Sequence, residues 1–273
     1  MTVAGTPDEL PRRFPGRSVI VTGGGTGIGL AIAERLAREG ATVMVVGPDQ
    51  AVLDAAVVSL SAFGDGAVAH CADLTERSLI DGIVDGALER WGKVDVLVNC
   101  AATDVESLFV DLPTEDWDRM MAVNLTAPFL LSQRVAQKMI EAGSGSIINI
   151  GSVAALASDG PYACYSASKA ALLAFTRSIA VELAPHGVRA NVVSPGYTHT
   201  DALVADGPKQ LAHMMNSFDR VPMGRLVQRP EVAEAVAFLA SDEAAAITGT
   251  SLVVDCGLTA NLYVHETLPQ EEE

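Results

Sequence analysis

The chain has 273 residues, of which 49% are apolar and 5% aromatic, so its core must be built largely from Ala, Val, Leu and Ile. Its formal net charge of −16 at pH 7 repels phosphate backbones and anionic lipid, and we therefore expect neither nucleic-acid nor membrane partners. No apolar run approaches the roughly 20 residues of a membrane span, and residues 1–15 lack the apolar core of a secretion signal.

The first predicted strand, at residues 18–22, leads into the glycine-rich run 23–29 and then into a helix that ends at Gly40. Strand, glycine turn and helix in this order are the setting of a loop that binds nucleotide phosphates. Glycines let the backbone approach the pyrophosphate, and the helix N-terminus offers free N–H groups and a partial positive charge. The run therefore predicts a dinucleotide-binding turn.

Strands and helices alternate along the rest of the chain. Strands are predicted at residues 42–46, 67–69, 94–99, 146–150, 188–193 and 251–255, and helices at 53–60, 79–91, 114–142, 165–183 and 231–240. The alternation indicates an α/β fold of Rossmann type, with a doubly wound parallel sheet of about seven strands and helices on both faces. We expect a flexible lead-in at 1–15, a single domain at 16–262 with a lid at about 197–226, and an acidic tail at 263–273.

Tyr165 and Lys169 are four residues apart in a predicted helix, so their side chains are expected on one face. A free tyrosine has a pKa of about 10 and is a poor acid or base at neutral pH. An adjacent positive charge favours the phenolate and lowers that pKa, which makes proton exchange with a substrate hydroxyl feasible. The pair is therefore a candidate acid–base centre.

The four cysteines are scattered, at Cys71, Cys100, Cys164 and Cys256, without the spacing of a metal-binding motif. This distribution is typical of reduced thiols, and we expect a cytoplasmic protein with no metal site.

Several motifs occur in the same order and on the same elements as in one known family. They are Thr22–Gly29 (Thr-Gly-x-x-x-Gly-x-Gly), Asp73-Leu74, Asn99-Cys100-Ala101-Ala102, Asn124, Ser152, Tyr165-x-x-x-Lys169 and Pro195-Gly196. In these residues the chain resembles the short-chain dehydrogenase/reductase family, over about residues 15–260. Two positions depart from the family pattern: Ala102 replaces a glycine and Cys100 an asparagine.

The resemblance implies hydride transfer between a nicotinamide cofactor and a carbonyl or alcohol carbon. Tyr165 would exchange the proton with the substrate oxygen, and Ser152 would orient that oxygen. Lys169 would lower the tyrosine pKa and hold the nicotinamide ribose, and Asn124 would position a water molecule in the proton relay. The cofactor contacts implied are Gly23, Gly25, Thr26, Gly27, Ile28, Gly29, Asp49, Asp73, Leu74, Asn99, Ala101, Tyr165, Lys169, Pro195, Gly196, Thr198 and Thr200.

The choice between NAD and NADP depends on the end of the second strand. NAD-specific relatives usually carry an acid at the position of Gly47, and NADP-specific ones often carry a basic residue at that of Pro48 or Thr26; this chain has neither. Asp49 lies about 20 residues beyond Gly29, the separation expected of a ribose-binding acid, and this favours NAD. The same residue could equally serve as a helix cap.

The substrate is expected to be a small molecule, a secondary alcohol or its ketone. The lid contributes Met214, Met215, Phe218 and Met223, and methionines adapt to irregular apolar shapes, which suggests a lipophilic substrate. Two alternatives stay open: a 3-oxoacyl-thioester reductase of fatty-acid or polyketide type, and a non-catalytic dinucleotide-binding regulator. The resemblance also implies a homo-oligomer, either a tetramer or a dimer.

Overall fold

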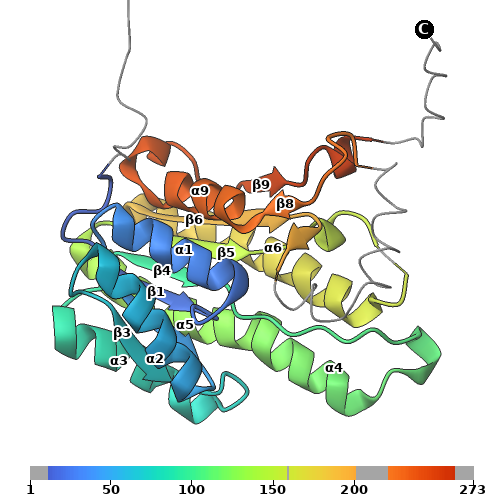
Figure 1. Ribbon diagram of the computed structural model, residues 1–273, viewed down its shortest axis with the longest axis horizontal. Helices are drawn as coiled ribbons and strands as arrows, with labels where there is room; N and C mark the ends of the chain where they lie inside the picture. Colours follow the sequence, from blue (N-terminus) through green and yellow to red (C-terminus); the bar gives the residue numbers. More distant parts are fainter. Residues whose placement is uncertain (1–11, 159, 201–220, 262–273) are drawn as a thin grey trace, which may run out of the picture.

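In the computed structural model, which describes residues 12–158, 160–200 and 221–261, the short apolar runs form one parallel sheet. Its strands follow the order β3-β2-β1-β4-β5-β6-β9, which confirms the predicted doubly wound arrangement of Rossmann type (Figure 1). The strands are β1 (Ser18–Thr22), β2 (Thr42–Gly47), β3 (Val68–Cys71), β4 (Val96–Asn99), β5 (Gly145–Ile150), β6 (Val188–Pro195) and β9 (Ser251–Val254).

Helices cover both faces of the sheet, because alternate residues of each strand point to opposite sides. Val19 and Val21 pack with α1, α2 and α9, which lie in front of the sheet in Figure 1, whereas Ile20 packs with α3, α5 and α6 on the other face. The helices are α1 (Gly27–Arg38), α2 (Gln50–Leu60), α3 (Arg77–Trp91), α4 (Thr114–Met121), α5 (Ala127–Ala142), α6 (Ala163–Leu183) and α9 (Arg229–Ala240).

The structure differs from the sequence prediction in two places. The single helix expected at 114–142 is divided by a π-helical turn, Ala122–Thr126, between α4 and α5. In the expected lid, the two-residue strands β7 (Thr198–His199) and β8 (Val227–Gln228) pair in parallel, while residues 201–220, with Met214, Met215 and Phe218, lie outside the described part, as does the expected tail. Among the described helices, none is both long and apolar enough to cross a membrane.

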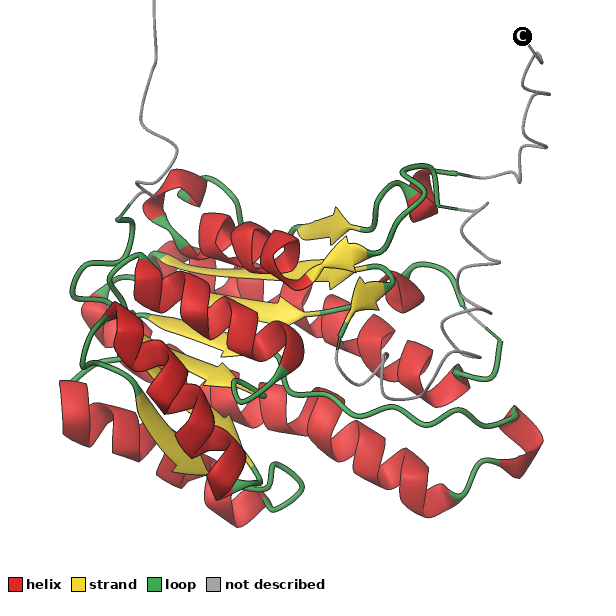
Figure 2. Ribbon diagram, in the orientation of Figure 1, coloured by secondary structure: helices red, strands yellow, loops and turns green. Residues whose placement is uncertain are grey.

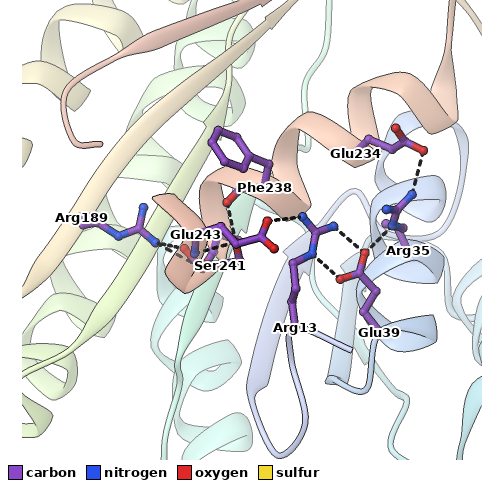
Figure 3. Close-up of polar contacts among 9 residues, drawn as sticks. Arg13, Arg35, Glu39, Arg189, Glu234, Phe238, Ser241 and Glu243 are labelled. Carbon is purple, nitrogen blue, oxygen red and sulfur yellow. Dashed lines mark hydrogen bonds and ion pairs between the residues drawn. The ribbon is translucent and has the colours of Figure 1, made fainter. Parts of the chain in front are cut away.

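The packed fold begins earlier than the lead-in boundary expected at residue 15. Phe14 is buried, and the Arg13 guanidinium donates through two nitrogens to the Glu39 carboxylate at 2.6 Å each, at the end of α1 (Figure 3). Arg35 donates to the same carboxylate and to Glu234 of α9. Buried between two guanidinium groups, Glu39 joins the N-terminal segment to α1 and α9.

A cavity of about 290 Å³ lies at the amino ends of the strands, opposite the end at which ligands bind in such sheets. Its arginines are already engaged: Arg189 donates to the carbonyl oxygens of Leu239 and Ser241 at the end of α9 (Figure 3). Arg17 donates to two acidic residues, Asp95 and Asp242. These contacts attach α9 to the sheet, and the cavity is a structural feature of that junction.

Candidate active site

The strand order reverses between β1 and β4, so the carboxyl ends of these two strands mark the topological switch point where a ligand binds. Thr22, the last residue of β1, connects the loop after β1 to the loop after β4 by hydrogen bonds. Its hydroxyl oxygen accepts hydrogen bonds from the backbone N–H of Cys100 at 3.0 Å and of Ala101 at 3.1 Å. The glycine turn and the loop after β4 are therefore held side by side.

The glycine turn fits a pyrophosphate. Gly23 has φ +66°, and a Cβ on Gly29 would overlap the carbonyl oxygen of Gly23, so only glycine allows the turn to close this tightly. Gly27 has φ +56° with no other group within 4 Å, so it borders open space. The side chain of Thr26, the residue before α1, caps no helical N–H. The first N–H groups of α1 are thus available to an anion, with Gly25 and Ile28 in the same turn.

Asp49 and Asp73 stand at the ends of β2 and β3, where the adenosine half of a dinucleotide would lie. The Asp49 carboxylate accepts from the N–H groups of Ala51 at 2.9 Å and Val52 at 3.2 Å, and so caps α2. Asp73 is exposed and accepts from the backbone N–H and hydroxyl of Thr75. Leu74 is buried in the core, so its side chain is not available to a ligand.

Asn99 was predicted to contact the cofactor, but its side chain lies in the core. It is 3% exposed and donates to the side chains of Asn149 at 2.8 Å and Ser132 at 3.3 Å. Asn149 in turn donates to the Thr176 hydroxyl of α6 at 2.8 Å. The Asn99 side chain therefore joins β4, β5, α5 and α6 beneath the site.

The remaining predicted cofactor contacts lie in the segment that follows β6, beside the end of β9. A Cβ on Gly196 would lie 2.8 Å from the Asp255 side chain, so the chain passes close to the end of β9. Thr198 donates through its hydroxyl to the Gly196 carbonyl at 2.9 Å. Pro195 is buried at the strand end, and Thr200 is the last described residue before the break.

Tyr165 and Lys169 lie together, as their spacing predicted. The Lys169 ammonium is 5.6 Å from the centre of the Tyr165 ring and donates to the carbonyl oxygen of Ile150, at the end of β5, at 2.9 Å. Lys169 is 2% exposed. The pair therefore lies at the carboxyl ends of the strands, beside β5, and not on the solvent-facing surface of α6.

Asn124 lies at the centre of the π-helical turn and reaches toward α6. Its amide nitrogen donates to the Ser168 hydroxyl at 3.1 Å and to the Thr103 carbonyl at 2.8 Å. Pro128 has no N–H, so the Asn124 carbonyl cannot receive the usual helical bond from four residues on, which favours an irregular turn between α4 and α5. Turns of this type are frequent at functional sites.

The pKa of Tyr165 is raised by burial, which disfavours the phenolate, although a hydrogen bond with Ser152 acts in the opposite direction. The Ser152 oxygen accepts from the Ala154 N–H at 3.1 Å, which leaves its hydrogen for the phenol oxygen. The sequence predicts that Lys169 lowers this pKa, whereas the net direction in the folded protein is upward, because burial has the largest effect. The Lys169 ammonium donates to the Ile150 carbonyl, and burial lowers its own pKa to about 8.

Two neighbours of the Tyr165–Lys169 pair were not singled out as functional from the sequence. Burial raises the pKa of the Cys100 thiol to about 12, although the positive charge of Lys169 opposes this rise, so the thiol stays neutral. Asp104, five residues beyond β4, adds its negative charge to the surroundings of both Tyr165 and Lys169. No motif marks Asp104, and only its nearness to a strand end could have drawn attention to it.

Comparison with known proteins identifies relatives over most of the chain. A family model described as enoyl-(acyl carrier protein) reductase matches residues 23–259. The 3-oxoacyl-(acyl-carrier-protein) reductase FabG of Escherichia coli K12 is 39% identical over 245 residues, which cover 90% of this chain and 98% of the relative.

Solved structures of two dehydrogenases also superpose on most of this chain. An NAD⁺-bound xylitol dehydrogenase superposes with a TM-score of 0.83 at 32% identity, over 89% of this chain and 98% of the other. A candidate NAD(P)-dependent gluconate 5-dehydrogenase from Beutenbergia cavernae, with NADP bound at low occupancy, superposes with a TM-score of 0.85 at 33% identity, over 92% of this chain and all of the other.

Proposed function

Because the chain belongs to the short-chain dehydrogenase/reductase family, and is thus an NAD(P)-dependent oxidoreductase, we propose that it interconverts a secondary alcohol and its ketone. The observation that carries this proposal is the cluster of Tyr165, Lys169, Ser152 and Asn124 at the carboxyl ends of β4 and β5. Ser152 hydrogen-bonds the Tyr165 phenol, the Lys169 ammonium lies 5.6 Å from its ring, and Asn124 is linked to the same helix through Ser168. A phenol with a neighbouring donor and cation is suited to proton exchange with a carbonyl or hydroxyl oxygen.

The nicotinamide supplies the hydride, or accepts it in the reverse direction, when it is bound. Tyr165 gives a proton to the substrate carbonyl oxygen during reduction and takes one from the hydroxyl during oxidation. Its raised pKa keeps it protonated at neutral pH, which is the form needed for reduction. Ser152 donates a hydrogen bond to the same oxygen and so stabilises the charge that develops on it.

Lys169 and Asn124 would bind the nicotinamide ribose and a water molecule through which Tyr165 exchanges protons with solvent. The Lys169 ammonium has three donors, of which one is occupied by the Ile150 carbonyl, so the others can bind the ribose hydroxyls. Asn124 ties Ser168 and Thr103 into a fixed arrangement beside the pair, where a water molecule would link Lys169 to solvent.

A 3-oxoacyl-thioester reductase is the second candidate, supported by the 39% identity to the E. coli reductase. An acyl carrier with a phosphate-bearing arm would favour a basic cleft rim. The described loop after β4 instead carries Asp104 and Glu106, and Arg225 near β8 is paired with Glu231 at 2.7 Å. These charges favour the neutral alcohol or ketone.

A spectrophotometric screen tests this assignment. Secondary alcohols, ketones and an acetoacetyl thioester are offered in parallel with both nicotinamide cofactors, and the change in absorbance at the reduced nicotinamide band is followed. We expect turnover with apolar secondary alcohols or ketones. Turnover with the thioester alone would replace the proposed substrate class by the second candidate.

We propose NAD as the cofactor, on the basis of Asp49. Its carboxylate caps α2 at the end of β2, where a 2′-phosphate would meet a negative charge and no basic side chain at Gly47 or Pro48. Asp49→Asn keeps the cap, since asparagine caps as well as aspartate, and removes the charge. We expect NADP to bind about threefold more tightly to this variant, with NAD affinity unchanged.

Titration calorimetry with each cofactor measures this change. Asp49→Ala is the matched control: it removes the charge together with the cap and should cost about 1 kcal/mol of stability. Equal NADP affinity in wild type and Asp49→Asn would show that Asp49 is a cap without influence on the cofactor choice.

A further inference from the structure

The loop after β4 carries an acidic residue, Asp104, whose position relative to α6 gives it a role in the proposed reaction. The segment leads from Cys100 to α4 and runs between α6 and the α4–α5 helices (Figure 2). Asp104 is exposed on this loop, as is Glu106 two residues further on. Two sets of hydrogen bonds fix the segment on either side of Asp104.

The first set holds the residue before Asp104. Asn124 binds both backbone groups of Thr103: its side-chain oxygen accepts from the Thr103 N–H at 2.9 Å, and its nitrogen donates to the Thr103 carbonyl at 2.8 Å. The same nitrogen donates to the Ser168 hydroxyl, which donates to the carbonyl of Tyr165 at 2.7 Å. Thr103 is therefore anchored beside Ser168.

The second set holds the residues after Asp104. The hydroxyl of Tyr162 donates to the Glu106 carboxylate at 3.1 Å, and the N–H of Ser107 donates to the carbonyl of Pro161 at 2.9 Å. Tyr162 is the N-cap residue of α6, and Pro161 precedes it. The loop thus runs antiparallel to α6, from Ser168 back to Tyr162.

Tyr165 lies in the first turn of α6, three residues after the N-cap residue Tyr162 and three before Ser168, so it lies between the two places where the loop is attached. Asp104, between the two anchor points of the loop, stands opposite the middle position. We propose that Asp104 is a positioning residue whose carboxylate stabilises the protonated form of the Tyr165–Lys169 pair.

The electrostatics of the pair agree with this geometry. Burial has the largest effect on both groups, raising the pKa of Tyr165 and lowering that of Lys169 to about 8, and the Asp104 carboxylate raises both. Cys100 acts in the same direction, but its thiol is uncharged because its own pKa is raised to about 12. Ser152 lowers the pKa of Tyr165 through its hydrogen bond. Of these neighbours, only Asp104 carries a negative charge at neutral pH.

The inference rests on the proposed function and adds how the reduction of the ketone and the oxidation of the alcohol depend on pH. A protonated Tyr165 donates to a carbonyl, whereas a phenolate accepts from an alcohol. Asp104 therefore extends the pH range in which Tyr165 is protonated and can donate to a ketone, and it moves the optimum for alcohol oxidation to more alkaline pH.

Asp104→Asn removes the charge and keeps the size of the side chain. We expect the apparent pKa of the pH profile for alcohol oxidation to fall by about half a pH unit at low ionic strength. Tyr165 and Lys169 titrate as a coupled pair, and because the carboxylate raises both pKa values, the direction is the same whichever group the profile reports. Asp104 is exposed, so added salt should reduce the difference between variant and wild type.

A second readout needs neither cofactor nor substrate. The tyrosinate absorbance of the protein is titrated with base, and subtraction of the Tyr165→Phe curve isolates Tyr165. Its midpoint should be lower in Asp104→Asn than in wild type. This titration separates the two proposals: undiminished turnover in Tyr165→Phe would remove the proposed proton donor, while the midpoint would still report the effect of Asp104 on the phenol.

Two variants serve as controls. Asp104→Glu keeps the charge and should restore the wild-type profile. Glu106→Gln removes a carboxylate from the same loop, keeps an acceptor for Tyr162, and should leave profile and midpoint unchanged. Coincident curves for Asp104→Asn and wild type, or an equal shift in Glu106→Gln, would overturn the assignment to Asp104.

Discussion

Replacement of Tyr165 by phenylalanine is expected to lower kcat/KM by about a thousandfold, within the range that a positioned acid–base group contributes. The substitution removes one hydroxyl and leaves the ring beside Lys169, so the packing of α6 is preserved. Because the proposed role of the phenol oxygen is proton exchange with the substrate, the Kd for the cofactor should change by no more than about twofold. Steady-state kinetics and titration calorimetry measure the two quantities.

Tyr162→Phe is the matched control for this experiment. It removes a hydroxyl from the residue just before α6, where the group binds Glu106 at 3.1 Å and lies outside the proposed proton path. We expect its kcat/KM to stay within about tenfold of wild type, since the hydrogen bond to Glu106 holds the loop and takes no part in proton transfer. Turnover by Tyr165→Phe at the wild-type rate would rule out Tyr165 as the proton donor.

Gly29→Ala is expected to weaken dinucleotide binding by about tenfold or more. The added Cβ would overlap the carbonyl oxygen of Gly23, so the turn between β1 and α1 must open. Overpacking of this kind costs about 1–3 kcal/mol, and 1.4 kcal/mol corresponds to a tenfold change in affinity. The loss should affect NAD and NADP alike, because the displaced N–H groups are those proposed to bind the pyrophosphate, which both cofactors share.

Gly82→Ala is the corresponding control, since Gly82 lies on the exposed side of α3 with no other group within 4 Å of an added Cβ. It should bind cofactor as wild type does and gain about 0.5–1 kcal/mol of stability, as expected for alanine within a helix. Calorimetric titration gives the affinities, and thermal unfolding checks that both variants are folded. Unchanged cofactor affinity in Gly29→Ala would contradict a phosphate-binding role for this turn.

Local patterns in the sequence predicted the parts of the protein that depend on short-range rules. The glycine run after the first strand and the four-residue spacing of Tyr165 and Lys169 both lie within one or two turns of chain, and the structure has them as expected. Likewise, the alternation of apolar strands and helices was sufficient to predict the seven-stranded parallel sheet. The π-helical turn at Asn124 was missed, because helix periodicity does not distinguish one extra residue in a turn.

The roles of individual polar side chains depended on long-range contacts. Asn99 follows a strand end as a cofactor ligand would, yet its side chain binds Asn149, 50 residues away, in the core. From the sequence, Asp49 was equally a candidate ribose-binding acid and a candidate helix cap. Its hydrogen bonds with the N–H groups of Ala51 and Val52 establish the cap.

The sequence by itself determined the fold, the glycine turn after the first strand and the proximity of the phenol and the ammonium, since each follows from residue spacing along the chain. Only the tertiary structure decided the charge balance at that pair. Burial by surrounding elements raises the pKa of Tyr165 and lowers that of Lys169, and the loop after β4 brings Asp104 opposite them. A pKa depends on the solvent and charges that surround a group in space, and these come from segments distant in the chain.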